Sequence, residues 1–168
     1  LSHVFVLKAF TKIYAMAGLR LGYALCSNED VLTKICQVRQ PWSVSGLAQR
    51  AGIAALKETE YVLKTRKLVH EQRKKMEAAL TELGYIVYPS QANYIFFRDP
   101  FKENQESLYS RMLKQGVLIR SCANYPGLDP FCYRICIKTA RENWEFLLQL
   151  KKCVDVERLQ NMTAKKGK

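Results

Sequence analysis

A lysine, a threonine and an arginine lie close together near the start of the chain, and together they could hold a phosphorylated aldehyde. Thr11 and Lys12 stand in a loop-like segment between two strand-like runs, and Arg20 follows the lysine after eight residues. A lysine amine can form a Schiff base with a carbonyl group and later move protons. An arginine grips phosphate with a planar fork of donors, and a neighbouring hydroxyl adds a hydrogen bond. The chemistry alone leaves a second interpretation open, in which Lys12 is a solvated loop lysine.

Two arginines further along the chain are candidates to bind an anion. Arg120 and Arg134 each end or interrupt an apolar run that favours a strand. Strand arginines can clamp a carboxylate or a phosphate with paired hydrogen bonds. Each also has an ordinary interpretation. Arg120 could be a surface residue at a strand end, and Arg134 could form an ion pair with Glu142 or Glu145.

Strands and helices that interleave must position these candidates, so the fold class is α/β. Short apolar or alternating runs predict strands over residues 4–7 (a buried strand), 19–26, 85–88, 93–98, 117–120 and 131–138. Helices are predicted over residues 29–36, with Asn28 as N-cap, and over 47–56, 62–83, 106–114 and 141–154. The strongest periodic signal is Val62, Val69, Met76 and Leu83, ended by Gly84. A coiled coil is the weaker alternative for this helix.

The composition indicates a folded domain with a basic surface. Of the 168 residues 48% are hydrophobic, and 27 Lys and Arg against 15 Asp and Glu give a net charge of +12. A basic nucleic-acid-binding module is the alternative from another functional class, but no nucleic-acid motif supports it. No apolar run reaches the ~18 residues of a membrane span, so we expect no membrane partner. The six cysteines carry no metal-ligand spacing and favour reduced, buried thiols in a cytoplasmic protein.

The segment 9–23, AFTKIYAMAGLRLGY, resembles the cofactor-lysine signature of fold-type I pyridoxal-phosphate enzymes, in the class I and II aminotransferase branch. In that signature a hydroxyl residue and a lysine precede Gly-Leu-Arg-x-Gly-Tyr. The resemblance implies pyridoxal phosphate as the cofactor and Lys12 as the catalytic residue that carries it. It also implies that Thr11 and Arg20 bind the cofactor's phosphate.

The resemblance continues downstream and implies the substrate-binding residues. Arg134 would clamp the substrate carboxylate, and Arg120 would contact a substrate phosphate or carboxylate. Asn93 and Tyr94 resemble an Asn-Phe/Tyr pair of the family's small domain, so Asn93 either lines the site or is structural. The implied organisation is a remnant of the large cofactor-binding domain (1–47), interdomain helices (48–84), a small α/β C-terminal domain (85–155) and a basic tail (156–168).

Within the family, the loop Asn124-Tyr125-Pro126-Gly127-Leu128 is closest to the threonine-phosphate decarboxylase subgroup, which acts in cobalamin biosynthesis. Histidinol-phosphate aminotransferases, or aromatic amino-acid aminotransferases, are the alternative. The implied substrate is a small phosphorylated amino acid or amino alcohol. The resemblance covers only the C-terminal portion of the family's chain. We therefore expect this chain alone to be inactive, to bind pyridoxal phosphate weakly or not at all, and to form a homodimer through apolar surface exposed on residues 1–47.

Overall fold

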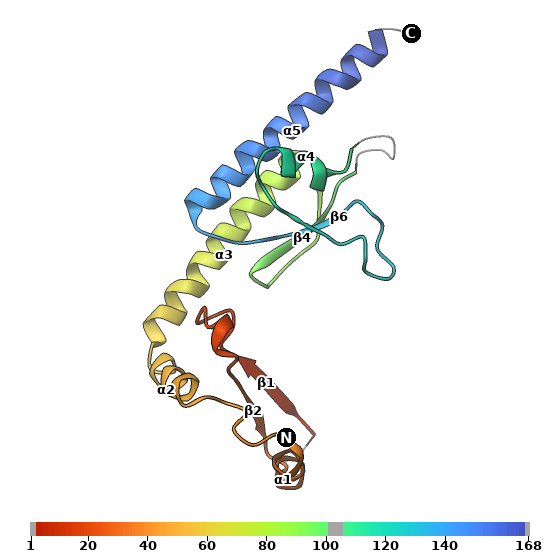
Figure 1. Cartoon of the computed structure of the whole chain (residues 1–168). Coiled ribbons are helices and arrows are strands. Elements are labelled where there is room, and N and C mark those ends of the chain that lie inside the picture. Colours follow the sequence, from red (N-terminus) through yellow and green to blue (C-terminus); the bar gives the residue numbers. More distant parts are fainter. Residues whose placement is uncertain (1–2, 101–105, 167–168) are drawn as a thin grey trace. The chain divides into compact units, whose positions relative to one another are not determined.

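The computed structural model describes residues 3–100 and 106–166, with side chains described as far as Val154. The chain divides into two compact units, Leu1–Arg66 and Lys67–Lys168, which are treated separately below. The boundary between them lies inside the long helix α3 (Thr59–Glu82). It therefore falls in the range 48–84 that the sequence assigns to interdomain helices (Figure 1).

The first unit is built on an antiparallel hairpin. Strand β1 (Phe5–Ala9) pairs with β2 (Gly22–Cys26), and a short 3-10 helix, η1 (Ala17–Leu19), lies in the connection between them. Two helices follow, α1 (Glu29–Val38) and α2 (Gly46–Ala55). Figure 1 shows the hairpin as two adjacent arrows near the start of the chain.

Side-chain caps begin both helices of this unit. The Asn28 side chain accepts a hydrogen bond from the Val31 amide at 3.2 Å, and Ser45 accepts one from Ala48 at 3.2 Å. Each bond satisfies one of the amides that a helix start leaves without an intrahelical partner. The predicted Asn28 cap is therefore confirmed.

Two expectations for the hairpin were wrong. β1 was predicted as a buried strand, yet all five of its residues are exposed, with Leu7 at 76%. This exposure agrees instead with the expectation that residues 1–47 expose apolar surface. A two-stranded hairpin has no second layer of its own, and none of the described elements buries its apolar side chains. The second strand was expected from residue 19 but begins at Gly22, because Arg20 adopts the left-handed conformation (φ 53°) that interrupts an extended strand.

Gly22 is explained by a close backbone approach. A Cβ atom at this position would lie 2.9 Å from the carbonyl oxygen of Lys8, a backbone atom on the paired strand. We expect Gly22→Ala to push the two strands apart and to lower the free energy of unfolding by about 1–3 kcal/mol, the usual cost of overpacking. Urea denaturation measures it. Gly18→Ala is the matched control, because a Cβ there meets no atom within 4 Å. Equal losses in the two variants would contradict this explanation.

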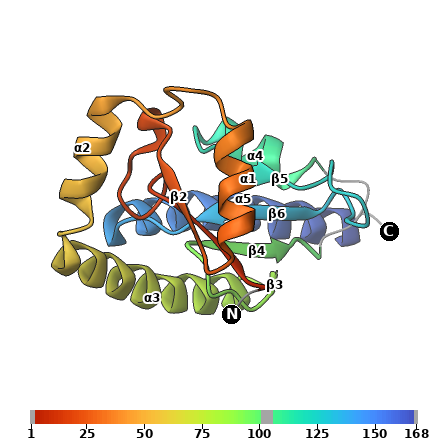
Figure 2. The same cartoon turned by 90° about the horizontal axis from the view of Figure 1, so that it is seen from below.

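The second unit is an antiparallel sheet with three helices. The sheet has the order β3-β4-β6-β5, and its strands are β3 (Ile86–Val87), β4 (Tyr94–Arg98), β5 (Arg120–Ser121) and β6 (Cys132–Cys136). Its other helices are α4 (Leu108–Lys114) and α5 (Ala140–Lys166). Figure 2 shows β4 and β6 side by side, with α5 running behind them.

One face of this sheet forms the core. Alternation along β4 and β6 turns four side chains to this face, and each is at most 7% exposed: Ile95, Phe97, Tyr133 and Ile135. They pack with buried residues of all three helices, among them Met76, Leu80, Met112 and Leu150. Of the heptad-spaced residues predicted for the long helix, Met76 belongs to this core and Val69 and Leu83 pack against it, whereas Val62 lies in the first unit. Gly84 ends this helix in a left-handed conformation (φ 92°), as expected.

Two other boundaries, and the burial of two cysteines, differ from the predictions. The expected strand 117–120 is reduced to β5, because the Val117 amide donates to the Met112 carbonyl (3.0 Å) and Gly116 is left-handed, so these residues close helix α4. Helix α5 continues to Lys166 through the segment expected as a basic tail. Cys36 and Cys136 are exposed rather than buried.

Within residues 3–100 and 106–166, no helix combines the length and apolar character needed to cross a membrane. The same residues hold no group of three or more His, Cys, Asp or Glu side chains arranged for a metal ion.

Candidate active site

Lys12 lies in the loop that joins the two strands of the hairpin. The loop continues the strand pairing by one step, because the Phe10 amide donates to the Leu21 carbonyl at 3.1 Å. Thr11 and Arg20 are the next residues along the chain on either side of this bond. The Lys12 carbonyl accepts a hydrogen bond from Ala15 at 3.1 Å, which turns the chain directly after the lysine.

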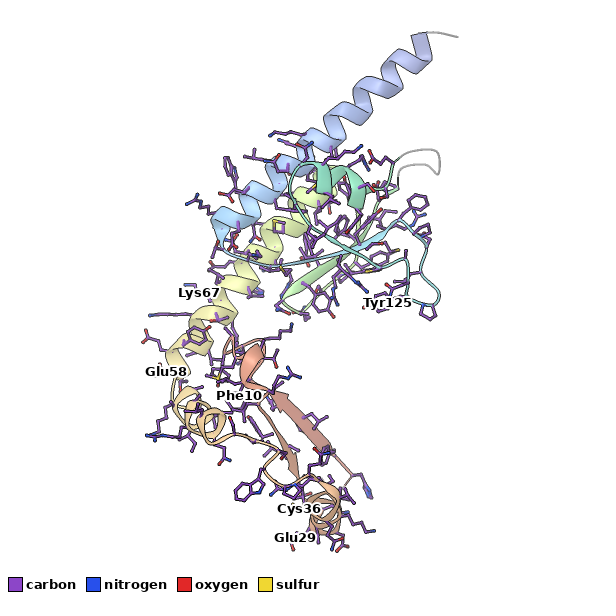
Figure 3. All side chains as sticks on the ribbon, in the orientation of Figure 1. Phe10, Glu29, Cys36, Glu58, Lys67 and Tyr125 are labelled. Carbon is purple, nitrogen blue, oxygen red and sulfur yellow. The ribbon has the colours of Figure 1, made fainter. Side chains whose placement is uncertain are left out.

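A buried aromatic residue anchors this loop. Phe10 is 3% exposed, and its ring lies 5.1 Å from the ring of Tyr14 and 5.8 Å from that of Tyr23. Gly52 of α2 packs against the same ring. Figure 3 labels Phe10 at this end of the hairpin. The anchor fixes the backbone on which Lys12 stands, while the Lys12 side chain itself is exposed to solvent.

Two non-glycine residues of the loop are held in the left-handed region, Ala15 (φ 54°) and Arg20 (φ 53°). Such a conformation costs roughly 1–2 kcal/mol per residue and tends to occur at functional sites. Here it turns the chain after Lys12 and again before β2. The Arg20 guanidinium donates one hydrogen bond to the Ala17 carbonyl, at 3.2 Å.

The donor set of this loop fits a phosphorylated aldehyde. An arginine carries five N–H donors, and no ion pair occupies Arg20 among the described residues. Lys12 provides a primary amine, and Thr11 provides a hydroxyl beside it. The assignment of these three residues to a cofactor stays a prediction from the sequence resemblance.

The second unit brings Arg120 and Arg134 together. They are direct partners in the pairing of β5 with β6, and Phe96 of β4 is the partner of Arg134 on its other side. Direct partners of antiparallel strands point to the same face, with Cβ atoms about 4.5–5.5 Å apart. Phe96, Arg134 and Arg120 therefore form a row across the sheet face opposite the core.

Neighbouring groups hold the two guanidinium groups. That of Arg134 lies over the Tyr94 ring, 5.0 Å from its centroid. Arg120 donates a hydrogen bond to the Asn124 side-chain oxygen at 3.0 Å and lies 5.9 Å from the centroid of the Tyr125 ring. Figure 3 shows Tyr125 on the loop that follows β5, away from α5. These partners orient the arginines without neutralising them.

The ordinary interpretation of Arg134, an ion pair with Glu142 or Glu145, is wrong. Glu142 accepts a hydrogen bond from Lys138 at 2.8 Å, and Glu145 pairs with Arg141 at 2.9 Å. Within the described part of the chain, neither Arg120 nor Arg134 has an acidic partner. Like charges placed directly opposite one another destabilise a sheet. A bound anion would therefore offset the repulsion between the positive charges of Arg120 and Arg134.

Glu142 has a different task, because it caps helix α5. Its carboxylate accepts hydrogen bonds from the Thr139 amide at 3.2 Å and hydroxyl at 2.7 Å, besides the bond from Lys138.

The bonds from Lys138 and then Thr139 lower the pKa of Glu142 from 4.5 to about 2. We expect a carboxyl resonance followed by NMR to titrate with a midpoint near pH 2. The stability that this lowered pKa contributes is complete above the unfolded-state value and is lost as the pH falls from about 4.5 towards 2. Lys138→Gln should raise the midpoint, whereas a midpoint above pH 4 in the unmodified chain would contradict this interaction.

Asn93 directly precedes β4 and is exposed, and its carbonyl accepts a hydrogen bond from the Ile137 amide at 2.8 Å. The segment before it is fixed by Arg73, which is 6% exposed and donates to the Ala92 carbonyl at 3.0 Å. The backbone of Asn93 is therefore structural. A contact of its side chain with substrate stays a prediction.

Three contacts around the arginines were not assigned from the sequence. Tyr94 lies under Arg134, while Asn124 and Tyr125 contact Arg120. The strand pattern carried a signal for Tyr94, because alternation places it on the face of Phe96, away from the core. The sequence singled out the loop that holds Asn124 and Tyr125 for its resemblance to the decarboxylase subgroup, but it gave no signal that these two side chains contact Arg120.

Comparison with known proteins identifies the family. The model of the family "aminotransferase class I and II" matches residues 2–149, and the chain belongs to that family. The chain is 39% identical over 150 residues to the threonine-phosphate decarboxylase of Salmonella typhimurium, and 40% identical over 149 residues to the histidinol-phosphate aminotransferase of Symbiobacterium thermophilum. Both alignments cover 89% of this chain but only 41% and 40% of the relatives, so the chain spans about two fifths of their length.

Solved structures confirm the expected α/β fold. The histidinol-phosphate aminotransferase of Clostridium acetobutylicum superimposes with a TM-score of 0.84 at 34% identity, and covers 92% of this chain and 46% of its own. The L-threonine-O-3-phosphate decarboxylase of Porphyromonas gingivalis gives a TM-score of 0.77 at 25% identity, over 92% of this chain and 47% of its own. The resemblance to the aminotransferase family is thus confirmed, while both subgroups occur among the relatives.

Proposed function

We propose that this chain is part of a pyridoxal-phosphate enzyme that acts on a small phosphorylated amino compound. The observation that carries the proposal is the direct pairing of Arg120 with Arg134 on the sheet face opposite the core, where neither has an acidic partner among the described residues. The names of both groups of relatives describe enzymes of phosphorylated amino compounds.

In this proposal the hairpin loop of the first unit holds the cofactor. Pyridoxal phosphate supplies an electron sink for the bonds at the substrate's amino-bearing carbon. Thr11 and Arg20 would bind its phosphate, and the Lys12 amine would condense with its carbonyl group with loss of water. When the Lys12 Nζ atom is free, it would accept or return a proton at the substrate's amino-bearing carbon.

The arginine pair binds the substrate's phosphate. Threonine phosphate carries a carboxylate and a phosphate, whereas histidinol phosphate carries only the phosphate, so phosphate is the anion that both candidate substrates share. An arginine clamp also opposes the departure of a carboxylate that it binds. A role in phosphate binding therefore suits either reaction, whereas the carboxylate clamp implied for Arg134 by the family suits only a reaction that retains the carboxylate.

Decarboxylation of threonine phosphate is the first candidate reaction. Its support is the loop 124–128, whose Asn124 and Tyr125 contact Arg120 directly and which resembles the decarboxylase subgroup. Transamination of histidinol phosphate is the second candidate, because relatives of that name match equally large parts of the chain. A homodimer is the proposed assembly, because the apolar residues of β1 are exposed.

A chimera tests this proposal. This chain would replace the matching part of the Salmonella typhimurium decarboxylase, with pyridoxal phosphate added. We expect release of carbon dioxide from O-phospho-L-threonine, and less amino transfer from histidinol phosphate to a 2-oxo acid. The reverse preference would support the second candidate. A folded chimera that binds the cofactor and processes neither phosphorylated compound would overturn the proposal.

A further inference from the structure

The loop between β5 and β6, residues 122–131, supplies the partners of Arg120. Asn124 accepts the hydrogen bond from the guanidinium group, and the Tyr125 ring lies beside it. β5 itself has only two residues, so its strand pairing constrains Arg120 weakly. The orientation of this guanidinium therefore depends on how firmly the loop is held.

Asp129 fastens the far end of this loop to the sheet. One carboxylate oxygen accepts a hydrogen bond from Arg98 Nε at 2.6 Å. The other oxygen accepts bonds from the Phe131 amide at 2.9 Å and from the Cys132 thiol at 3.4 Å. A single carboxylate thus ties together the loop, the start of β6 and the end of β4.

Arg98 lies on the same sheet face as Arg120 and Arg134. It is the register partner of Cys132 and lies two residues beyond Phe96, which is the partner of Arg134. Its guanidinium lies 6.0 Å from the centroid of the Phe131 ring. Three arginines therefore point to one face, and Asp129 neutralises only Arg98.

The charges of the ion pair are stable at neutral pH. The hydrogen bond from Arg98 lowers the pKa of Asp129, and the same bond raises the pKa of Arg98. The carboxylate is consequently ionised and committed to Arg98.

We propose that the Arg98–Asp129 ion pair is a positioning device for phosphate binding. It fixes the loop that presents Arg120. Neither residue touches the phosphate, so both act through Arg120. This inference rests on the proposed function, because it assumes that Arg120 and Arg134 bind phosphate.

The experiment is a titration of the 168-residue chain with inorganic phosphate, followed through the arginine Nε–Hε resonances by NMR. We expect Arg120 and Arg134 to shift in the unmodified chain, and Arg98→Gln and Asp129→Asn each to weaken phosphate binding roughly 3- to 10-fold, as is usual for coupled neighbours. The double variant should weaken it no further. Arg98→Lys, which retains a charged partner for Asp129, should restore part of the affinity.

Matched controls come from a second ion pair on the exposed surface of α5, Arg141 with Glu145 at 2.9 Å. Arg141→Gln and Glu145→Gln change the net charge equally and should leave phosphate affinity unchanged. Unaltered affinity in Arg98→Gln and Asp129→Asn, with the wild-type response intact, would overturn this inference alone. A wild-type chain whose Arg120 and Arg134 ignore phosphate would overturn the anion site of the proposed function as well.

Discussion

Replacing Lys12 by alanine is expected to lower the turnover of either phosphorylated substrate by at least about 10²–10⁴-fold in the active chimera. That range is the usual contribution of a positioned acid or base, and the lost attachment point for the cofactor adds to it. Lys12 is exposed and stands outside both strands, so the variant should retain its fold. Steady-state rates with saturating pyridoxal phosphate measure the effect.

Lys8→Ala is the matched control for Lys12→Ala. Lys8 is an exposed lysine of β1 on the same hairpin, and its removal should leave turnover unchanged. Reduction with borohydride in the presence of pyridoxal phosphate, followed by peptide mass spectrometry, should label Lys12 and spare Lys8. Label on other lysines of the hairpin, or full turnover in Lys12→Ala, would exclude Lys12 as the attachment site.

The sequence identified the loop of Lys12 because its information is local. Thr11, Lys12, Arg20 and Gly22 lie within one short segment of the chain. Gly22 sits where a Cβ would meet the Lys8 carbonyl oxygen at 2.9 Å. Periodicity likewise identified the core-facing side of α3. Local spacing is therefore enough to predict the long helix, whereas the cofactor role of Thr11, Lys12 and Arg20 stays a prediction.

The pairing of Arg120 with Arg134 could not be predicted from local sequence spacing. Arg120 and Arg134 become register partners only when β5 pairs with β6, and that pairing depends on the loop between them. Arg98 and Asp129 are 31 residues apart in the chain, and no periodic pattern links them. Burial of β1 was also predicted wrongly, because an apolar run indicates which residues favour burial but not which layer covers them.

Because Arg120 and Arg134 lie directly opposite each other and have no acidic partner among the described residues, removing one charge should affect anion binding much more than the free energy of unfolding. Arg134→Gln removes one or more charge-assisted hydrogen bonds to the anion, each contributing about 1.5–3 kcal/mol. It also ends the repulsion between directly opposed like charges, worth about 0.2–1 kcal/mol, and the contact with the Tyr94 ring, worth about 0.5–1 kcal/mol at an exposed site. The last two effects have opposite signs, so they nearly cancel in the free energy of unfolding.

We therefore expect Arg134→Gln to weaken phosphate binding by roughly 10- to 100-fold, at about tenfold per 1.4 kcal/mol, while the free energy of unfolding changes by less than about 1 kcal/mol. Isothermal titration with phosphate and urea denaturation measure the two quantities. Tyr94→Leu is the complementary variant, because it removes the ring under Arg134 but leaves both charges, and should weaken binding less. If Arg134→Gln instead unfolds the unit and Arg134→Lys does not rescue phosphate binding in a folded chain, Arg134 is a structural arginine and the row across the sheet is no anion site.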